Sequence, residues 1–243
     1  SNAVAAIAAV RRGGAQEHRD LLGMMLALRD EQGAPALTRE AIMGEISNFM
    51  FTALEPTPSI LTLVFYLLAT HPEVARELHA ELDAVLGGRP PVIADLDNLR
   101  YTKMVVQETM RLYPPALMIM RVAKSRDQLG PYRIPAGSRL LINIYGMHYH
   151  PDYWDDPQRF DPARMAPERL SHDARVPYYP FGLGARRCSG ELMAVAQMQL
   201  IVAALAQQMQ FELPEGHRPV FSHARSVSFQ PEGGLPMNAI LRH

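Results

Sequence analysis

Residues 181–190 constrain this chain more than any other segment, because they place its only cysteine in a glycine-rich loop. The segment is FGLGARRCSG, and an apolar helical pattern begins directly after it. Glycine permits positive φ angles and lets the backbone approach a flat ligand closely. A thiolate just before a helix N-terminus is stabilised by the helix dipole and by free amide groups. The loop therefore favours an anionic sulfur presented to a metal over an inert thiol.

A single cysteine limits the chemistry of the whole chain. It excludes an internal disulfide and any zinc or iron–sulfur site built from several cysteines, and it fits a reducing, cytoplasmic compartment. Outside such a loop, a lone cysteine is usually a small buried hydrophobe. The formal net charge of −1 gives no overall field that attracts nucleic acid or an anionic membrane. Because no stretch reaches about 18 uninterrupted apolar residues, we expect no membrane segment.

Hydrophobic periodicity predicts a mainly α-helical domain with small β-sheets. The expected helices cover residues 17–32, 38–70 with Thr38 as N-cap, His71-Pro72 to Gly87-Gly88, 98–112 and 190–209. Short apolar runs predict strands at residues 116–123, 138–144, 209–212 and 236–242. Residues 148–185 lack regular periodicity, and a connection of that length is usually functional.

The cysteine loop matches, at every fixed position, the heme-binding pattern F-x-x-G-x-R-x-C-x-G of the cytochrome P450 heme-thiolate monooxygenases. The matching residues are Phe181, Gly184, Arg186, Cys188 and Gly190. This resemblance implies that Cys188 ligates the iron of heme b, that Arg186 contacts a heme propionate and that Phe181 shields the sulfur. It also places Gly182 and Gly190 at the cofactor. Thiolate ligation favours O–O cleavage.

Glu108 and Arg111 share a helix face at i, i+3. Taken alone, they are typical of a surface ion pair of small energy. The same family, however, has an E-x-x-R pair in such a helix, completed by the arginine of an F-x-P-x-R segment. Residues 160–165, FDPARM, supply Arg164, with Met165 where an aromatic residue is usual. The resemblance implies a structural triad that holds the irregular segment presenting Cys188.

Two further positions have weaker patterns. Arg121 lies in a predicted strand, at the position from which the family often contacts a heme propionate; the alternative is an exposed strand arginine. His148 and His150 form an H-x-H pair that could suggest a metal site. An isolated pair in a turn region is better explained as surface residues or a secondary heme contact.

The helix predicted over residues 38–70 departs from the family pattern. It resembles the family's long central helix with A-G-x-[DE]-T-T, where Glu55 supplies the acid and Pro56 replaces a threonine that takes part in proton delivery. A proline in a helix interior removes a hydrogen bond and kinks the helix, at about 3 kcal/mol. We expect Glu55, Thr57 or the substrate to deliver protons; the alternative is that Pro56 and Pro58 only bend the helix.

The resemblance assigns residues 4–243 to the C-terminal, heme-loop part of a single cytochrome P450 domain whose N-terminal part is absent. Residues 1–3, SNA, are typical of the remnant of tag cleavage. The implied function is a monooxygenase that hydroxylates, epoxidises or oxidatively couples a small organic substrate in natural product metabolism. Its electrons would come from a separate ferredoxin or flavodoxin and reductase. The alternatives are a peroxide-driven or non-oxygenating heme enzyme, and a heme-free fragment that acts as a binding module.

Overall fold

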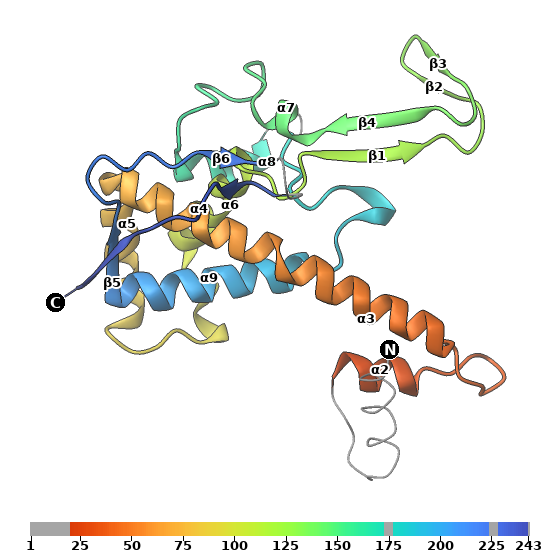
Figure 1. Cartoon of the computed structure of the whole chain (residues 1–243), viewed down its shortest axis with the longest axis horizontal. Coiled ribbons are helices and arrows are strands. Elements are labelled where there is room, and N and C mark those ends of the chain that lie inside the picture. Colours follow the sequence, from red (N-terminus) through yellow and green to blue (C-terminus); the bar gives the residue numbers. More distant parts are fainter. Residues whose placement is uncertain (1–19, 173–176, 224–227, 243) are drawn as a thin grey trace. The chain divides into compact units, whose positions relative to one another are not determined.

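The computed structural model describes residues 20–172, 177–223 and 228–242. Across these residues the chain is mainly helical, with small two-stranded sheets (Figure 1). The predicted fold class is therefore confirmed. The chain divides into two compact units, Ser1–Glu55 and Pro56–His243, and each is described by itself.

The first unit contains helix α2 (Leu21–Ala27) and helix α3 (Arg39–Leu54). Thr38 is the N-cap of α3, as predicted, and its hydroxyl accepts a hydrogen bond from the amide of Ala41 at 3.2 Å. The prediction that the preceding helix extends to residue 32 is wrong. The carboxylate of Asp30 accepts hydrogen bonds from the amides two and four residues further on, and this turn replaces the last helical turns.

The two prolines divide the helix predicted over residues 38–70. Helix α3 ends at Leu54, and helix α4 (Pro56–Thr70) begins two residues later. Both prolines lie in the first turn of α4, where an amide has no helical acceptor to lose. The expected penalty of an interior proline is therefore avoided. By length and composition, Arg39–Thr70 as a whole could cross a membrane. This is weak evidence for a membrane span, because core helices of soluble proteins meet the same criterion.

The second unit is built on α4 and three further helices whose predicted positions are confirmed within two residues. These are α5 (Pro72–Leu86), α6 (Arg100–Leu112) and α9 (Glu191–Gln208). Pro72 begins α5, and Gly87 ends it in the left-handed conformation that glycine adopts readily. Short helical segments occupy the connections: η1 (Ile93–Asp95), α7 (Ile144–His148), η2 (Pro162–Met165), α8 (Pro167–His172) and η3 (Gly184–Arg186).

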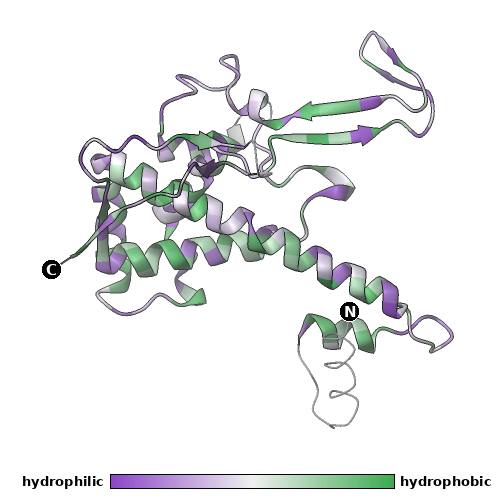
Figure 2. Ribbon diagram, in the orientation of Figure 1, coloured by the Kyte–Doolittle hydropathy of each residue, from purple (hydrophilic) through white to green (hydrophobic). Residues whose placement is uncertain are grey.

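The hydrophobic core of the second unit lies where these four long helices pack together. On α5, every fourth residue from Val74 to Leu86 is buried, so one helical stripe faces the core. Figure 2 shows hydrophobic residues distributed along α4 and α9. The buried residues of the other three helices include Ile60, Leu63, Val64, Leu67, Val105, Val106, Met110, Met198, Val202, Ala203 and Ala206. This core fixes α6, which carries Glu108 and Arg111, and α9, which follows the cysteine loop.

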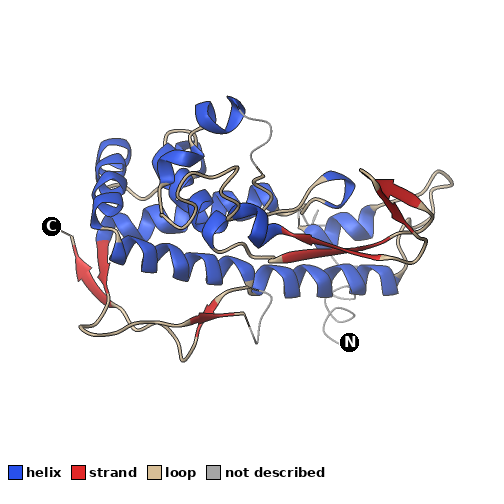
Figure 3. Ribbon diagram, turned by 90° about the horizontal axis from the view of Figure 1, so that it is seen from above, coloured by secondary structure: helices blue, strands red, loops and turns tan. Residues whose placement is uncertain are grey.

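Paired strands lie outside the helical core of the second unit (Figure 3). The antiparallel pairs are β1 (Met118–Val122) with β4 (Arg139–Asn143), β2 (Asp127–Leu129) with β3 (Tyr132–Ile134), β5 (Met209–Glu212) with β8 (Asn238–Leu241), and β6 (Phe221–Ser222) with β7 (Gln230–Pro231). The pattern predicted β1, β4, β5 and β8. It did not predict the other four strands, whose two or three residues are too few to show alternation.

Polar side chains fix the start of α6 from two sides. Glu81 of α5 accepts hydrogen bonds from the amides of Tyr101 and Thr102, which are unpaired donors in the first helical turn. The second contact comes from α9, where the buried side-chain amide of Gln199 donates to the carbonyls of Leu96 and Leu99. Because α9 begins three residues after Cys188, these bonds also anchor the end of the cysteine loop.

Candidate functional site

Residues 181–190, the Cys188 loop, form a closed turn that leaves the thiol exposed. The amide of Cys188 donates to the carbonyl of Phe181 at 2.9 Å, which closes the loop. Gly182 and Gly184 have φ angles of 73° and 69°, a region that disfavours other residues. The ring of Phe181 packs against the core, so the loop is attached to the second unit at its first residue.

Helix α9 begins immediately after the loop. Gly190 is its N-cap and provides no side-chain cap for the first-turn amides. A Cβ atom at position 190 would lie 3.8 Å from the sulfur of Cys188, so the thiol is close to the start of the helix.

Strand β1 lies beside the Cys188 loop. A Cβ atom at Gly182 would come within 3.3 Å of the side chain of Ile119, so glycine permits the close approach. Arg121 is two residues further along the strand and therefore projects from the same face as Ile119. Its exposed guanidinium donates to the carbonyl of Met120, the only acceptor it has among the described residues. Arg186 in the loop is also exposed.

The donor set of the Cys188 loop fits heme. Within the described ranges, no three His, Cys, Asp or Glu side chains come together to hold a metal ion. A lone thiolate suits a metal that brings its other ligands with it, as the iron of a macrocycle does. The glycines at 182, 184 and 190 have no side chains, so the backbone at these positions can approach a flat ligand.

Glu108, Arg111 and Arg164, which we call the carboxylate clamp, meet in the structure. Both side chains of the Glu108–Arg111 pair are fully buried, so the surface-pair alternative is wrong. Two parallel hydrogen bonds of 2.8 Å join the guanidinium of Arg111 to the carboxylate. The Nε of Arg164 lies 3.6 Å from the same carboxylate. Such a bidentate pair is directional as well as strong.

The clamp also holds the irregular segment that follows α7. Arg111 donates to the carbonyls of His148 and Pro157 at 2.8 Å and to that of Arg159 at 3.2 Å. Burial raises the pKa of Glu108, while the Arg111 guanidinium, the amide of Asp161 and Arg164 act in the opposite direction. One buried side chain thus joins α6 to three points of a segment that has little regular structure.

Other contacts complete the clamp. The guanidinium carbon of Arg111 lies 4.9 Å from the ring centre of the buried Trp154, within the range of a cation–π interaction. Arg164 donates to the carbonyl of Asp156 at 3.0 Å. Met165, which replaces an aromatic residue of the family pattern, is 1% exposed in η2. The apolar role of that position is thus retained.

The interpretation of His148 as a surface residue or a heme contact is wrong. Its side chain is fully buried, and its Nδ1 lies 3.1 Å from the carbonyl of Arg111. Its Nε2 accepts a hydrogen bond of 3.1 Å from the amide of Tyr179. Burial lowers the pKa of His148 to about 4. His150, by contrast, is about half exposed.

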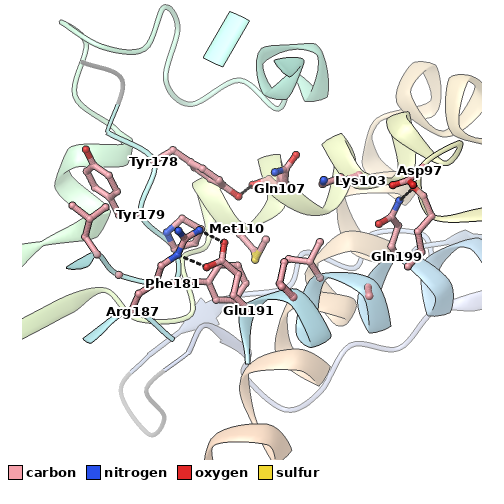
Figure 4. Close-up of a pocket in the computed structure, with 17 residues that line it drawn as sticks. Asp97, Lys103, Gln107, Met110, Tyr178, Tyr179, Phe181, Arg187, Glu191 and Gln199 are labelled. Atoms are coloured by element: carbon pink, nitrogen blue, oxygen red, sulfur yellow. Dashed lines mark hydrogen bonds and ion pairs between the residues drawn. The ribbon is translucent and has the colours of Figure 1, made fainter. Parts of the chain in front are cut away.

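A cavity of about 540 Å³ lies between α6, α9 and the start of the Cys188 loop (Figure 4). Tyr178 reaches across it to donate to the carbonyl of Gln107 at 3.0 Å. At its edge, Arg187 of the loop pairs with Glu191, the first residue of α9; the arginine is exposed and the glutamate is partly exposed. Sequence reasoning found neither the cavity nor Tyr178, because no motif marks a side chain that bonds to a distant backbone carbonyl.

The two predicted proton-delivery residues lie on either side of the helix division. Glu55 is the C-cap of α3, and Thr57 is the second residue of α4. Both are partly exposed. Pro56 occupies the first position of α4, so the expected departure from a continuous helix is present at this point.

The exposed thiol, the loop glycines and the helical core are the features that a heme-thiolate protein requires. The sequence model of cytochrome P450 matches residues 5–236. A crystal structure of a cytochrome P450 superposes with a TM-score of 0.89 at 28% identity, covering 98% of this chain and 54% of the other. The chain belongs to the cytochrome P450 family.

Curated relatives include enzymes from Streptomyces. Cyclooctat-9-en-7-ol 5-monooxygenase of Streptomyces melanosporofaciens is 38% identical, over 82% of this chain and 43% of the relative. Pentalenene oxygenase of Streptomyces avermitilis is 37% identical, over 78% and 42%. A mammalian relative, lithocholate 6-beta-hydroxylase of Mesocricetus auratus, is 32% identical over 92% and 45%. The chain therefore spans less than half the length of these relatives.

Proposed function

We propose that this chain provides the heme-thiolate site of a monooxygenase that inserts oxygen from O2 into a small organic substrate or oxidatively couples such substrates. The exposed thiol of Cys188, held beside the start of α9, carries the proposal. Bound heme b would supply the redox chemistry that activates O2. The chain's contribution is to hold the sulfur, orient the ring and exclude competing ligands.

Individual residues have distinct roles in this proposal. The thiolate of Cys188 is the ligand. Phe181 closes the loop through its carbonyl, and its assigned role is to shield the sulfur when heme is bound. Arg186 and Arg121, both exposed, pair with the two propionates. Gly182 and Gly190 keep the face of the loop free of side chains. The carboxylate clamp positions the segment that leads to the loop.

Proton delivery is assigned to Glu55 and Thr57. Pro56 has no side-chain hydroxyl, so it cannot replace the threonine of the family pattern. Glu55 and Thr57, one residue to either side in the sequence, carry a carboxylate and a hydroxyl that can transfer a proton. Glu55 keeps a polar interaction in the structure and is partly exposed, as a proton carrier in contact with water requires.

The names of two relatives support a substrate class for the proposed enzyme. The names of the Streptomyces enzymes denote oxidation of small unsaturated organic molecules, pentalenene and cyclooctat-9-en-7-ol. We therefore assign this chain to natural product metabolism, with an apolar substrate. Electrons come from a separate ferredoxin or flavodoxin and its reductase, and the compartment is the cytoplasm, consistent with the single unpaired cysteine.

An absorption spectrum tests this proposal. The purified chain is loaded with heme, reduced and exposed to carbon monoxide, and we expect the strongly red-shifted band that only thiolate-ligated heme gives. A Cys188→Ser variant serves as the control, because serine keeps the size of the side chain and removes the sulfur. Absence of the band in the parent chain contradicts the proposal and favours a heme-free binding module.

Pro56 favours a second candidate, a peroxide-driven heme enzyme, because such a reaction does not require the threonine hydroxyl. The two candidates differ in their source of electrons. A peroxide-driven enzyme converts substrate with hydrogen peroxide alone, whereas the monooxygenase needs O2, a reductase and its iron–sulfur or flavin partner. Turnover measured under both conditions with the same heme-loaded protein separates them.

A further inference from the structure

The imidazole of His148 joins two segments that are distant in the sequence. One ring nitrogen faces the carbonyl of Arg111 at the end of α6, and the other faces the amide of Tyr179, just before the Cys188 loop. A backbone amide can only donate, so Nε2 is the acceptor and Nδ1 carries the proton. Both ring nitrogens are therefore satisfied by backbone groups, and only the neutral ring satisfies them.

Contacts around the ring fix its orientation. Tyr178 stacks on it, with ring centroids 5.6 Å apart and an interplanar angle of 23°. The hydroxyl of Tyr178 is bonded to the carbonyl of Gln107 on α6. The carbonyl of His148 itself accepts from Arg111, so the two residues exchange hydrogen bonds. The ring cannot rotate without breaking at least one of these contacts.

A continuous series of hydrogen bonds leads from the clamp to the sulfur-bearing residue. Glu108 bonds to Arg111, Arg111 and His148 bond to each other, and His148 bonds to Tyr179. The carbonyl of Tyr179 then accepts from the amide of Gly182 at 3.0 Å. The final bond, within the Cys188 loop, joins Cys188 to Phe181. His148 is the side chain that connects the clamp to the backbone of the loop.

We propose that His148 is a positioning residue that fixes the Cys188 loop relative to the carboxylate clamp through its two ring nitrogens. This role rests on the proposed function, since it concerns the loop assigned to heme. In this proposal the carboxylate clamp also positions the Cys188 loop, a role that the burial of the clamp does not by itself imply. The clamp is the fixed point, and His148 transmits its position to residues 179–188.

Three substitutions separate the two hydrogen bonds. In His148→Asn, the side-chain amide replaces Nδ1 but does not reach Tyr179. In His148→Gln, the longer side chain places an acceptor near Tyr179 and leaves the Nδ1 position empty. In His148→Phe, a ring of similar size makes neither bond. Matched substitutions at His150, half exposed on the same segment, are the controls.

Two measurements are made on the full chain. Amide hydrogen exchange at Tyr179 needs no heme, and we expect it to be about tenfold faster in His148→Asn and His148→Phe than in the parent. The change in His148→Gln should be smaller. After heme loading, the fraction of reduced, carbon monoxide-bound protein with the red-shifted band should fall in the same order. The His150 variants should match the parent in both measurements.

Several results would overturn the proposal. Unchanged exchange at Tyr179 in the Asn and Phe variants would show that His148 does not hold this amide. If exchange instead rises equally at Leu82 in the core of α5, His148 acts on overall stability and not on the loop. A parent chain without the heme band contradicts the proposed function, whereas the exchange at Tyr179 still tests the role of His148.

Discussion

The carboxylate clamp and the Cys188 loop are connected by hydrogen bonds, yet they differ in almost every physical property. Glu108 and Arg111 are fully buried and bonded to each other, to backbone carbonyls and to the amide of Asp161. Residues 183–189 of the loop are all exposed. The clamp thus has its polar groups paired within the protein, while the loop presents its groups outward.

This difference indicates how the two regions divide one task. A ligand site needs exposed groups, and exposed loops have little packing to fix their geometry. A buried ion pair stabilises weakly overall but specifies geometry, because neither charge can leave its partner without a large desolvation penalty. His148 lies between the two regions and is as buried as the clamp. The rigid region therefore provides the position, and the exposed region provides the ligands.

The largest effect should come from Glu108→Gln, which keeps the shape of the side chain and removes its charge. Arg111 would then remain buried without a charged partner. We expect the free energy of unfolding to fall by about 3–5 kcal/mol, as measured by urea denaturation.

The matched control is Glu191→Gln, which removes the carboxylate of an ion pair whose arginine is 60% exposed. Exposed pairs contribute at most about 1 kcal/mol. An equal fall in the free energy of unfolding in the two variants would mean that the buried Glu108–Arg111 pair stabilises the protein no more than the exposed pair does.

A change in pH should weaken the connection between the two regions. Burial lowers the pKa of His148 from 6.5 to about 4, beside the Arg111 guanidinium and the ring of Tyr178. Between pH 4 and pH 6.5, His148 binds a proton in the unfolded chain but not in the folded chain. The free energy of unfolding should therefore fall by about 3 kcal/mol as pH decreases from 6.5 to 4, with no effect of this group above that range.

Urea denaturation between pH 4 and 7 measures this effect. The His148→Gln variant is the control, because its side chain does not titrate while the partly buried His79, whose pKa is also lowered, remains. The pH dependence should be weaker in the variant than in the parent. The same slope in both proteins would contradict a buried, neutral His148.

Local chemistry explains which parts of this fold were predictable. The bounds of α5 follow from Pro72 and Gly87, because a missing amide and a positive φ angle are properties of single residues. The i, i+3 spacing also predicted that Glu108 and Arg111 meet. Their burial was not predictable, since it depends on Trp154 and on carbonyls almost 50 residues away.

The remaining features depend on tertiary structure. His148 bonds to backbone groups 37 and 31 residues away, and a backbone group leaves no trace in the sequence. Pro56 predicted a disturbed helix, but whether the chain bends or starts a new helix depends on where the prolines fall within a turn. The small strands β2 and β3 were missed because pairing with a partner, and not periodicity, defines them.

The smallest of the predicted effects concerns the contact of the Cys188 loop with β1. Gly182 and Gly184 have nearly the same positive φ angle, so alanine at either position costs about 1 kcal/mol. Only at Gly182 would the new Cβ atom press on Ile119, whereas nothing lies within 4 Å of it at Gly184. We therefore expect Gly182→Ala to lower the free energy of unfolding more than Gly184→Ala, by up to about 1 kcal/mol.

Urea denaturation of the two variants measures the difference. If it is zero, the loop is not packed on the strand, and its position depends on its other contacts, namely the ring of Phe181, His148 and the start of α9.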